Sequence, residues 1–237
     1  MTSVTPGWTA TLARQRDRLE VGSTSERVAA LLRTQVLDGS LRPGVQLTEE
    51  QLVEALGVSR NTIREALQRL AAQRLVEHHR HRGVFVRRLA PDDLADLCGL
   101  RRALECGALR EAATRDVLDP AAVEAVTTAA YDGERAARDA QWEDVGTANA
   151  AVHLALAGLA GNARLDEAMR GLVAEMRLAF VVLADARAMH EPYVVENAKL
   201  AALVADGRLV DAADALDAYL RRAEDHLLSA YGEVVGG

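Results

Sequence analysis

The chain has 237 residues, of which 49% are hydrophobic and 27% are charged, and its formal net charge is −7. This length and composition are typical of one or two globular domains and exclude a disordered or collagen-like chain. The apolar runs are too short to cross a bilayer, and arginines interrupt the N-terminal segment where a secretion signal would need apolar residues. We therefore expect a cytoplasmic protein with no membrane partner.

The charge is distributed unevenly along the chain. Residues 22–88 carry 11 arginines and 7 carboxylates, whereas the residues after them carry 14 basic and 26 acidic side chains. A basic front on an acidic body indicates that only the front meets a polyanion such as nucleic acid. A helix start at Pro91 predicts a domain boundary. We expect a flexible N-terminal arm over 1–21, a front domain over 22–89 and an all-helical domain over 90–237.

The front domain begins with three predicted helices. The first spans 23–37, Thr48 is expected to cap the second, and Ser59 is expected to cap the third. Gly57 and Val58 separate the second helix from the third. A short turn containing glycine between two helices is typical of a helix-turn-helix.

The third predicted helix has one apolar and one polar face. Ile63, Ala66, Leu67 and Leu70 recur at helical spacing, which turns the polar residues outward. Such a polar row is most often only a solvated face. Its place on the second helix of a tight pair favours DNA contact, because arginine and asparagine can each make two parallel hydrogen bonds to a base edge. The outward residues are Arg60, Asn61, Arg64 and Gln68.

Two strand-like segments follow, over 75–79 and 84–88, and a basic turn joins them. Valine and phenylalanine favour strands, and Gly83 allows the bend. The pattern predicts a two-stranded wing. Its tip, with Arg82 beside Gly83, is suited to DNA phosphates or to a minor groove.

These motifs together resemble the winged helix-turn-helix of the GntR family of bacterial transcription regulators. The resemblance rests on LTEEQL at 47–52, GVSRNTIREAL at 57–67, LVE at 75–77 and RGVFV at 82–86. Two residues depart from the family pattern. Thr62 replaces a common proline, and Arg74 replaces a common glycine, where it either adds a phosphate contact or strains the helix end. The resemblance implies DNA contacts from Ser59, Arg60, Asn61, Thr62, Arg64, Gln68, Arg82 and Gly83.

The acidic rear domain is predicted to be all helical. Breaks are expected at Asp119-Pro120, Gly161, Pro192 and Gly207. The first helix and the segment from His153 to Asn162 resemble the FCD effector domain of the FadR-like subgroup. The predicted fold class is therefore mostly α, with a winged helix-turn-helix followed by a helical bundle. The expected helices are 92–115, 119–139, 142–160, 162–188, 191–206 and 208–230.

Members of this subgroup commonly hold a divalent metal with an acid four residues before a histidine and two further histidines. Here the corresponding residues are Asn149, His153, Asn197 and Tyr219, so only His153 is retained. The lost carboxylate and imidazoles are the ligands that transition metals prefer, and we expect no metal and no cofactor.

Two interpretations of this region are open. In the first, Arg101, Asn149, His153, Asn197 and Tyr219 line a polar pocket that binds an effector directly, with Arg101 pairing with a carboxylate or phosphate. In the second, the same residues hold together a filled core, and the domain only dimerises.

The resemblance implies a sequence-specific DNA-binding transcriptional regulator. We expect a repressor that binds a palindromic operator as a homodimer and is released by a small-molecule effector, such as an organic acid. One alternative is a constitutive DNA-binding protein whose rear domain only dimerises. Another is a helical-bundle enzyme that uses His153, but no nucleophile with its base and no phosphate loop is recognisable, so we expect no enzyme.

Overall fold

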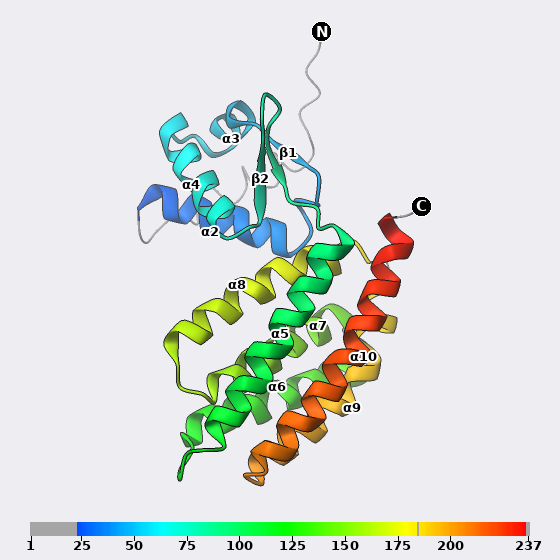
Figure 1. The fold of residues 1–237 in the computed structure, drawn as a ribbon. Helices are drawn as coiled ribbons and strands as arrows, with labels where there is room; N and C mark the ends of the chain where they lie inside the picture. The colour runs from blue at the N-terminus through cyan, green and yellow to red at the C-terminus, as the bar shows by residue number, and fades with distance from the viewer. Residues whose placement is uncertain (1–22, 184, 236–237) are drawn as a thin grey trace. The chain divides into compact units, whose positions relative to one another are not determined.

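The computed structural model describes residues 23–183 and 185–235, and the predicted arm over 1–21 lies outside them. The chain forms two compact units (Figure 1). The first contains the described residues up to Leu89 together with Arg177–Val182. The second contains Ala90–Met176 and the described residues from Leu183 on.

The helices of the first unit begin at the residues that the sequence predicts. The side chains of Ser23, Thr48 and Ser59 each accept a hydrogen bond from a backbone N–H in the first turn. Gly57 ends one helix with φ of 65°, which a residue without a side chain adopts at little cost. The helices are α2 (Thr24–Leu37), α3 (Glu49–Leu56) and α4 (Arg60–Ala72).

The wing is a three-stranded antiparallel sheet, in the order β1-β3-β2. Strands β2 (Val76–His79) and β3 (Gly83–Val86) form the expected hairpin, and β1 (Gln46–Leu47) pairs with the free edge of β3. The prediction of a two-stranded wing missed β1. Two residues are too few to show the alternation of polar and apolar side chains that identifies a strand.

The core of the first unit lies between these helices and the sheet. α2 packs on α4, and α3 packs on α4. The third predicted helix is amphipathic as expected, because its apolar residues are buried while the opposite face is exposed. The central buried side chains are Val28, Leu32, Leu52, Ile63, Leu67 and Val86.

The second unit is a helical bundle. Pro91 and Pro120 begin two of its helices, where the missing N–H of proline costs no hydrogen bond. α6 packs closely against α7 and α9, while α5 packs against α10. The helices are α5 (Pro91–Ala112), α6 (Pro120–Arg138), α7 (Trp142–Gly158), α8 (Ala163–Phe180, its last turn in the first unit), α9 (Ala186–Ala205) and α10 (Leu209–Val235).

The expected helix break at Pro192 was wrong. The interruption lies earlier, because α8 ends at Phe180 and Asp185 caps α9 by accepting from the Ala188 N–H at 2.8 Å. Pro192 lies inside α9. Ala188, whose carbonyl loses its helical partner there, and Pro192 are both exposed, so water can satisfy that carbonyl.

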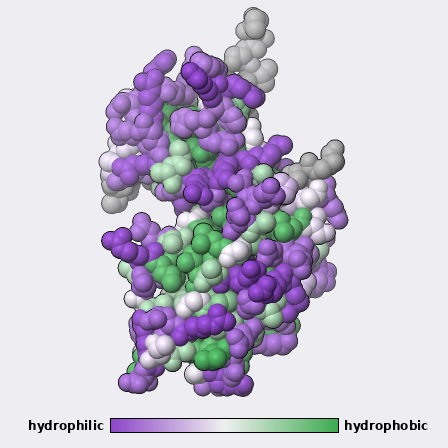
Figure 2. All heavy atoms as spheres, in the orientation of Figure 1, coloured by the Kyte–Doolittle hydropathy of each residue, from purple (hydrophilic) through white to green (hydrophobic). Residues whose placement is uncertain are grey.

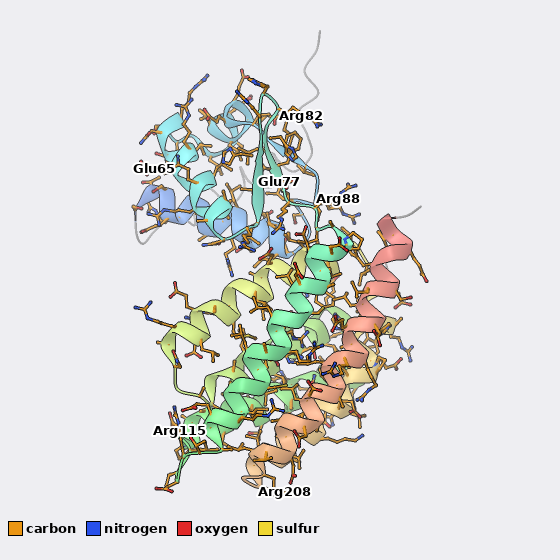
Figure 3. The ribbon with its side chains drawn as sticks, in the orientation of Figure 1. Glu65, Glu77, Arg82, Arg88, Arg115 and Arg208 are labelled. Atoms are coloured by element: carbon orange, nitrogen blue, oxygen red, sulfur yellow. The ribbon has the colours of Figure 1, made fainter. Side chains whose placement is uncertain are left out.

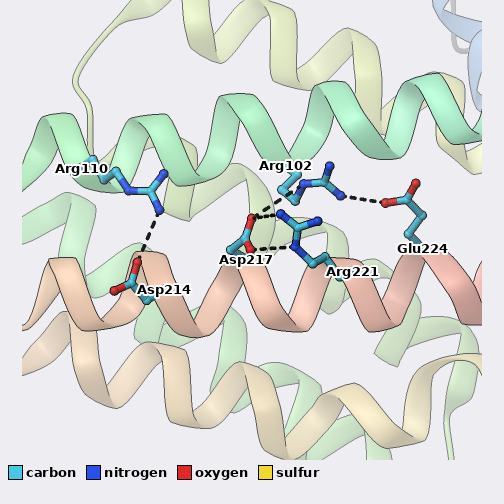
Figure 4. A network of polar contacts seen from close by, with 6 residues as sticks. All are labelled: Arg102, Arg110, Asp214, Asp217, Arg221 and Glu224. Atoms are coloured by element: carbon cyan, nitrogen blue, oxygen red, sulfur yellow. Dashed lines mark hydrogen bonds and ion pairs between the residues drawn. The ribbon is translucent and has the colours of Figure 1, made fainter.

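Ion pairs line the contact between α5 and α10 (Figure 4). Arg102 contacts Glu224 at 2.8 Å and Asp217 at 3.7 Å. Arg110 contacts Asp214 at 3.4 Å. These pairs are partly exposed, so each contributes little by itself, and the buried apolar side chains beneath them dominate the packing. Within the described ranges, no helix combines the length and apolar character that crossing a membrane requires.

Candidate functional site

The exposed face of α4 presents the polar residues predicted to contact DNA. Arg60, Asn61, Arg64 and Gln68 are exposed, whereas Ile63 is fully buried. Glu65 lies on the same helix, also exposed (Figure 3). The helix therefore offers a row of long polar side chains to solvent from its first turn onward, which is where recognition helices contact base edges.

The first turn of α4 is held by a capping contact. The Ser59 hydroxyl accepts from the Thr62 N–H at 3.1 Å and lies 2.8 Å from the Thr62 hydroxyl. Thr62 supplies here a side-chain hydroxyl and a backbone N–H that proline would lack. The capping bond orders the start of the helix, and the predicted DNA contacts of both residues stay predictions.

Two of the residues predicted to contact DNA bases are hydrogen-bonded to carboxylates. Arg64 Nε donates to Glu49 Oε1 at 2.7 Å, and Asn61 Nδ2 donates to Glu65 Oε1 at 2.7 Å. The hydrogen bond from Arg64 lowers the pKa of Glu49, and the charges of Arg64 and Arg60 act in the same direction against desolvation. Glu49 is therefore ionised at neutral pH, beside the cationic part of α4.

The wing tip is held by contacts on both sides. Gln46 Nε2 donates to the carbonyl of Arg82 at 2.6 Å, and the Arg82 guanidinium lies over the Phe85 ring at 5.5 Å. His79 contacts the same ring edge to face, with centroids 5.1 Å apart. Gly83 has φ of 99°, a conformation that favours glycine. The tip thus presents an exposed arginine on a fixed turn (Figure 3).

Arg74 has φ of 57°, which lies in the left-handed region. It follows Gln73, the C-cap of α4, at a position where helices commonly end on glycine. A side chain there costs conformational energy. Of the two interpretations of this departure, strain at the helix end therefore has a direct structural basis.

The predicted effector residues of the second unit come together in one buried network. Arg101 Nε donates to Glu105 Oε1 at 2.8 Å, and Glu105 Oε2 lies 2.7 Å from His153 Nδ1. His153 Nε2 lies 3.2 Å from the Tyr219 hydroxyl. Asn149 Oδ1 accepts from Asn197 Nδ2 at 2.7 Å and lies 3.2 Å from the same hydroxyl.

The ionisation of this network follows from its burial. Desolvation and the charge of Arg101 lower the pKa of His153 despite Glu105, so the imidazole is neutral at pH 7. Burial raises the pKa of Glu105, but the charge of Arg101 and the hydrogen bonds from Arg101 and His153 outweigh it. Since a carboxylate only accepts, His153 Nδ1–H donates to Glu105, which leaves Nε2 as an acceptor facing the Tyr219 hydroxyl. That hydroxyl has one proton, which it donates either to this nitrogen or to Asn149 Oδ1. Asn149 Oδ1 accepts from Asn197 in either case.

Glu105 is the member of the network that the sequence analysis missed. It is fully buried and joins Arg101 to His153. Its position four residues after Arg101 is the spacing of a helical ion pair. This spacing could have predicted the ion pair with Arg101, but it does not distinguish a buried ion pair from one exposed to solvent.

The space around this network is small. A cavity of about 10 Å³ is lined by Asn149, Asn197 and His190 together with neighbouring apolar residues. This is about the space that one water molecule needs. Two polar atoms of the network, Arg101 Nη2 and Asn197 Oδ1, are buried without a hydrogen-bond partner among the described residues.

The residues at the family's metal position do not fit a metal. Both nitrogens of His153 are engaged, by Glu105 and Tyr219, and asparagine is a neutral oxygen donor. The described part of the chain contains no cluster of three or more His, Cys, Asp or Glu suited to a metal ion, so neither His190 nor His226 completes a ligand set there.

The first unit thus has the architecture of a winged helix-turn-helix DNA-binding domain, and it is joined to a helical bundle with a buried polar centre. Residues 24–86 match the family described as bacterial regulatory proteins, gntR family, and residues 96–222 match the FCD domain. A solved GntR transcriptional regulator from Rhodococcus sp. RHA1 is 39% identical, with a TM-score of 0.80, over 89% of this chain and 100% of that one. The chain belongs to the GntR family of DNA-binding transcriptional regulators and carries an FCD domain.

Two curated relatives match the chain over part of its length. The "Uncharacterized HTH-type transcriptional regulator BphR" of Paraburkholderia xenovorans (strain LB400) is 41% identical over 91 residues, which are 38% of this chain and 37% of the relative. The "Probable D-xylose utilization operon transcriptional repressor" of Paenarthrobacter nicotinovorans is 34% identical over 88 residues, 37% of this chain and 39% of the relative. The chain therefore spans less than half the length of these two relatives. These relatives are named as regulators, and the family is one of DNA-binding regulators rather than enzymes.

Proposed function

We propose that the protein is a repressor that binds a palindromic operator as a homodimer, and that an organic acid bound in the helical bundle releases it. The observation that carries the DNA-binding part is the exposed row of α4, together with the fixed arginine of the wing tip. Arg60, Asn61 and Arg64 would contact base edges in the major groove. Arg82 would contact phosphates or the minor groove.

A dimer is proposed because one recognition helix contacts only a few base pairs. Two copies related by a twofold axis place two such helices at a fixed spacing, which a palindromic site matches. The bundle has apolar surface available for this contact: Leu100 on α5 is 50% exposed, and hydrophobic residues gather on its visible face (Figure 2). Exposed apolar patches of this kind are typical of protein interfaces.

The effector is proposed to enter the buried network. Arg101 Nη2 is buried, has no hydrogen-bond partner among the described residues and could bind a carboxylate oxygen. The further polar groups are those of Asn149, His153, Asn197 and Tyr219. The cavity of about 10 Å³ is too small for an organic acid, so helices of the bundle must move apart when the ligand binds. That movement is a means by which a ligand could favour one state of the protein over another.

The same cavity favours a second candidate function. A network that is almost fully paired, with space for about one water molecule, is what a filled core requires. In this candidate the protein binds DNA constitutively, and the bundle only dimerises.

DNA binding is tested by selection from a random-sequence duplex library with the full chain, with its size in solution measured by light scattering. We expect an inverted repeat from the selection and twice the monomer mass. A selected pool without base preference, or a monomer bound to DNA, would contradict the proposal.

The effector is tested with the operator thus recovered. Organic acids and sugar acids are screened by thermal shift, and those that stabilise the protein are added to the operator complex. Release that is lost in Arg101→Lys and in His153→Gln, but kept in Arg110→Lys on the same helix, supports the pocket. Release unchanged in the first two variants at equal stability contradicts the pocket, and no stabilisation by any compound favours the constitutive candidate.

A further inference from the structure

Glu49 contacts the centre of the recognition helix from a neighbouring helix. It is the first residue of α3, and its Oε1 accepts from Arg64 Nε at 2.7 Å across the helix-turn-helix. Arg64 lies on the second turn of α4, with 60% of its side chain exposed. We propose that Glu49 is a specificity-determining positioning residue, which selects the edge of the Arg64 guanidinium that meets the DNA and weakens binding to non-cognate duplex. This inference rests on the proposed base contact of Arg64.

The first part of the inference follows from which nitrogen is occupied. A guanidinium can offer two parallel donors either from its end, through both Nη atoms, or from its side, through Nε and one Nη. Glu49 occupies Nε, and the two Nη atoms of Arg64 have no hydrogen bond within the described residues. The pair therefore leaves the end of the fork available for the O6 and N7 acceptors of a guanine and blocks the side approach.

Because the contact also limits the side-chain rotations of Arg64, it reduces the conformational entropy that binding must remove. An unrestrained arginine with 60% exposure would distribute its guanidinium among base edges and nearby phosphates. Held at Nε, the side chain is already directed before DNA arrives. We expect this restraint to favour one base at one position rather than to raise affinity for every sequence.

The second part concerns charge. Glu49 is ionised, because the hydrogen bond from Arg64 and the charges of Arg64 and Arg60 lower its pKa. A carboxylate on this surface opposes the approach of phosphates and compensates one arginine of α4. Non-cognate binding is almost wholly electrostatic, whereas specific binding also has base contacts. Glu49 therefore weakens non-cognate binding more than operator binding, which raises the ratio between them.

The experiment compares Glu49→Ala, Glu49→Gln and the control Glu50→Ala in the full chain. Glu50 is exposed in the same turn of α3, and neither a hydrogen bond nor an ion pair is recorded for it in the part of the chain that the structure describes. Each variant is taken through selection from a random-sequence duplex library. Its affinity for the selected operator and for a scrambled duplex is then measured between 50 and 200 mM salt, which are ordinary conditions for such titrations.

In Glu49→Ala we expect about a three- to tenfold gain in scrambled-duplex affinity, and a salt dependence steeper by about one charge per recognition helix, because the freed arginine pairs with a phosphate. The base preference at one operator position should fall by a similar factor, and that position should be the one affected by Arg64→Ala. Glu49→Gln should show the gain in scrambled-duplex affinity but keep the base preference, because the glutamine Oε1 still accepts from Nε. Glu50→Ala should keep the selected sequence unchanged.

The double variant Glu49→Ala, Arg64→Ala separates positioning from a merely structural role. The inference requires that Glu49→Ala has no further effect on base preference once Arg64 is absent. An equal effect in both backgrounds would overturn it, and so would equal losses on operator and scrambled DNA. If the wild-type chain itself shows no base preference, the proposed function fails and the inference fails with it. If the wild-type chain shows one and Glu49→Ala keeps it, only the inference fails.

Discussion

The two units of this molecule place their polar side chains in opposite environments. In the first unit Arg60, Arg64 and Arg82 are exposed, and the contacts that hold Arg64 and Arg82 lie at the surface. In the second unit Glu105 and His153 are 0% and 2% exposed and form one network with Arg101. Exposed groups keep their water until a partner replaces it, whereas buried groups must satisfy each other in the folded chain. The exposed side chains should therefore determine DNA binding, and the buried network should determine the free energy of unfolding.

The largest effect on stability is expected from a substitution of Glu105 in the buried network. Glu105→Ala leaves the guanidinium of Arg101 buried without its carboxylate, and we expect a loss of about 3–5 kcal/mol in the free energy of unfolding. Urea unfolding followed by circular dichroism measures it. The matched control is Glu111→Ala, an exposed position on the same helix, where about 0.5 kcal/mol or less is expected. Similar small losses in both variants would show that the buried network does not carry stability.

The exposed set is tested by DNA affinity. Arg64→Ala should reduce operator binding by about 1–3 kcal/mol and relax base preference, while Arg82→Ala should weaken binding evenly across sequences. Arg69→Ala is the control, because Arg69 lies on α4 but contacts Glu26 of α2 at 3.2 Å. Unfolding temperatures should be nearly unchanged in all three variants. Equal losses on operator and random duplex for Arg64→Ala would contradict its base contact.

The buried set should also make the second unit sensitive to acid. The folded pKa of His153 lies below its usual value, so the unfolded chain binds the proton first, and stability falls as the pH drops below about 6.5. The folded pKa of Glu105 is also lowered, which extends the loss below about pH 4.3. One group with an unfolded pKa near 6.5 can contribute at most about 2 kcal/mol to this loss between pH 7 and pH 5. His153→Gln should flatten the unfolding free energy over that interval, and an unchanged slope would contradict the assignment of a neutral imidazole.

The smallest change in the free energy of unfolding is expected from a substitution of Arg74. Arg74→Gly removes the cost of a side chain at φ of 57° but adds backbone entropy to the unfolded chain, for a net gain of about 0.5–1 kcal/mol. Thermal unfolding measures this change. In Arg69→Gly, inside α4, the same replacement should destabilise by about 1 kcal/mol. If operator affinity also falls in Arg74→Gly, the phosphate contact is the better interpretation of this residue.

Much of the first unit could be predicted because its signals are local. Ser23, Thr48 and Ser59 mark helix starts, Gly57 marks an end, and the spacing from Ile63 to Leu70 fixes which face of α4 is buried. Each of these depends on neighbours within a few residues. β1 was missed because it is defined only by its partner strand β3, which lies almost forty residues later.

The second unit was less predictable for the same reason. Its helices follow from periodicity, but the predicted break at Pro192 does not occur, because Asp185 caps the start of α9 and the exposed proline lies inside that helix. The resemblance identified four positions of the network, Arg101 was added as the group that would pair with an anion, and Glu105 was not among these five residues. Its role depends on a contact with His153, which lies 48 residues away in sequence, and a pattern of neighbouring residues cannot predict such a contact.

The segment from Gln46 to Glu49 contacts both elements of the first unit that we propose to contact DNA. Gln46 holds the wing through the Arg82 carbonyl, and Glu49 holds the guanidinium of Arg64. A displacement of these four consecutive residues would therefore act on the hairpin tip and on α4 together. One short stretch of backbone thus links the position of the wing tip to the orientation of the Arg64 side chain. A single residue inserted between Gln46 and Glu49 would separate these two contacts and change the distance between the two proposed DNA-contacting groups.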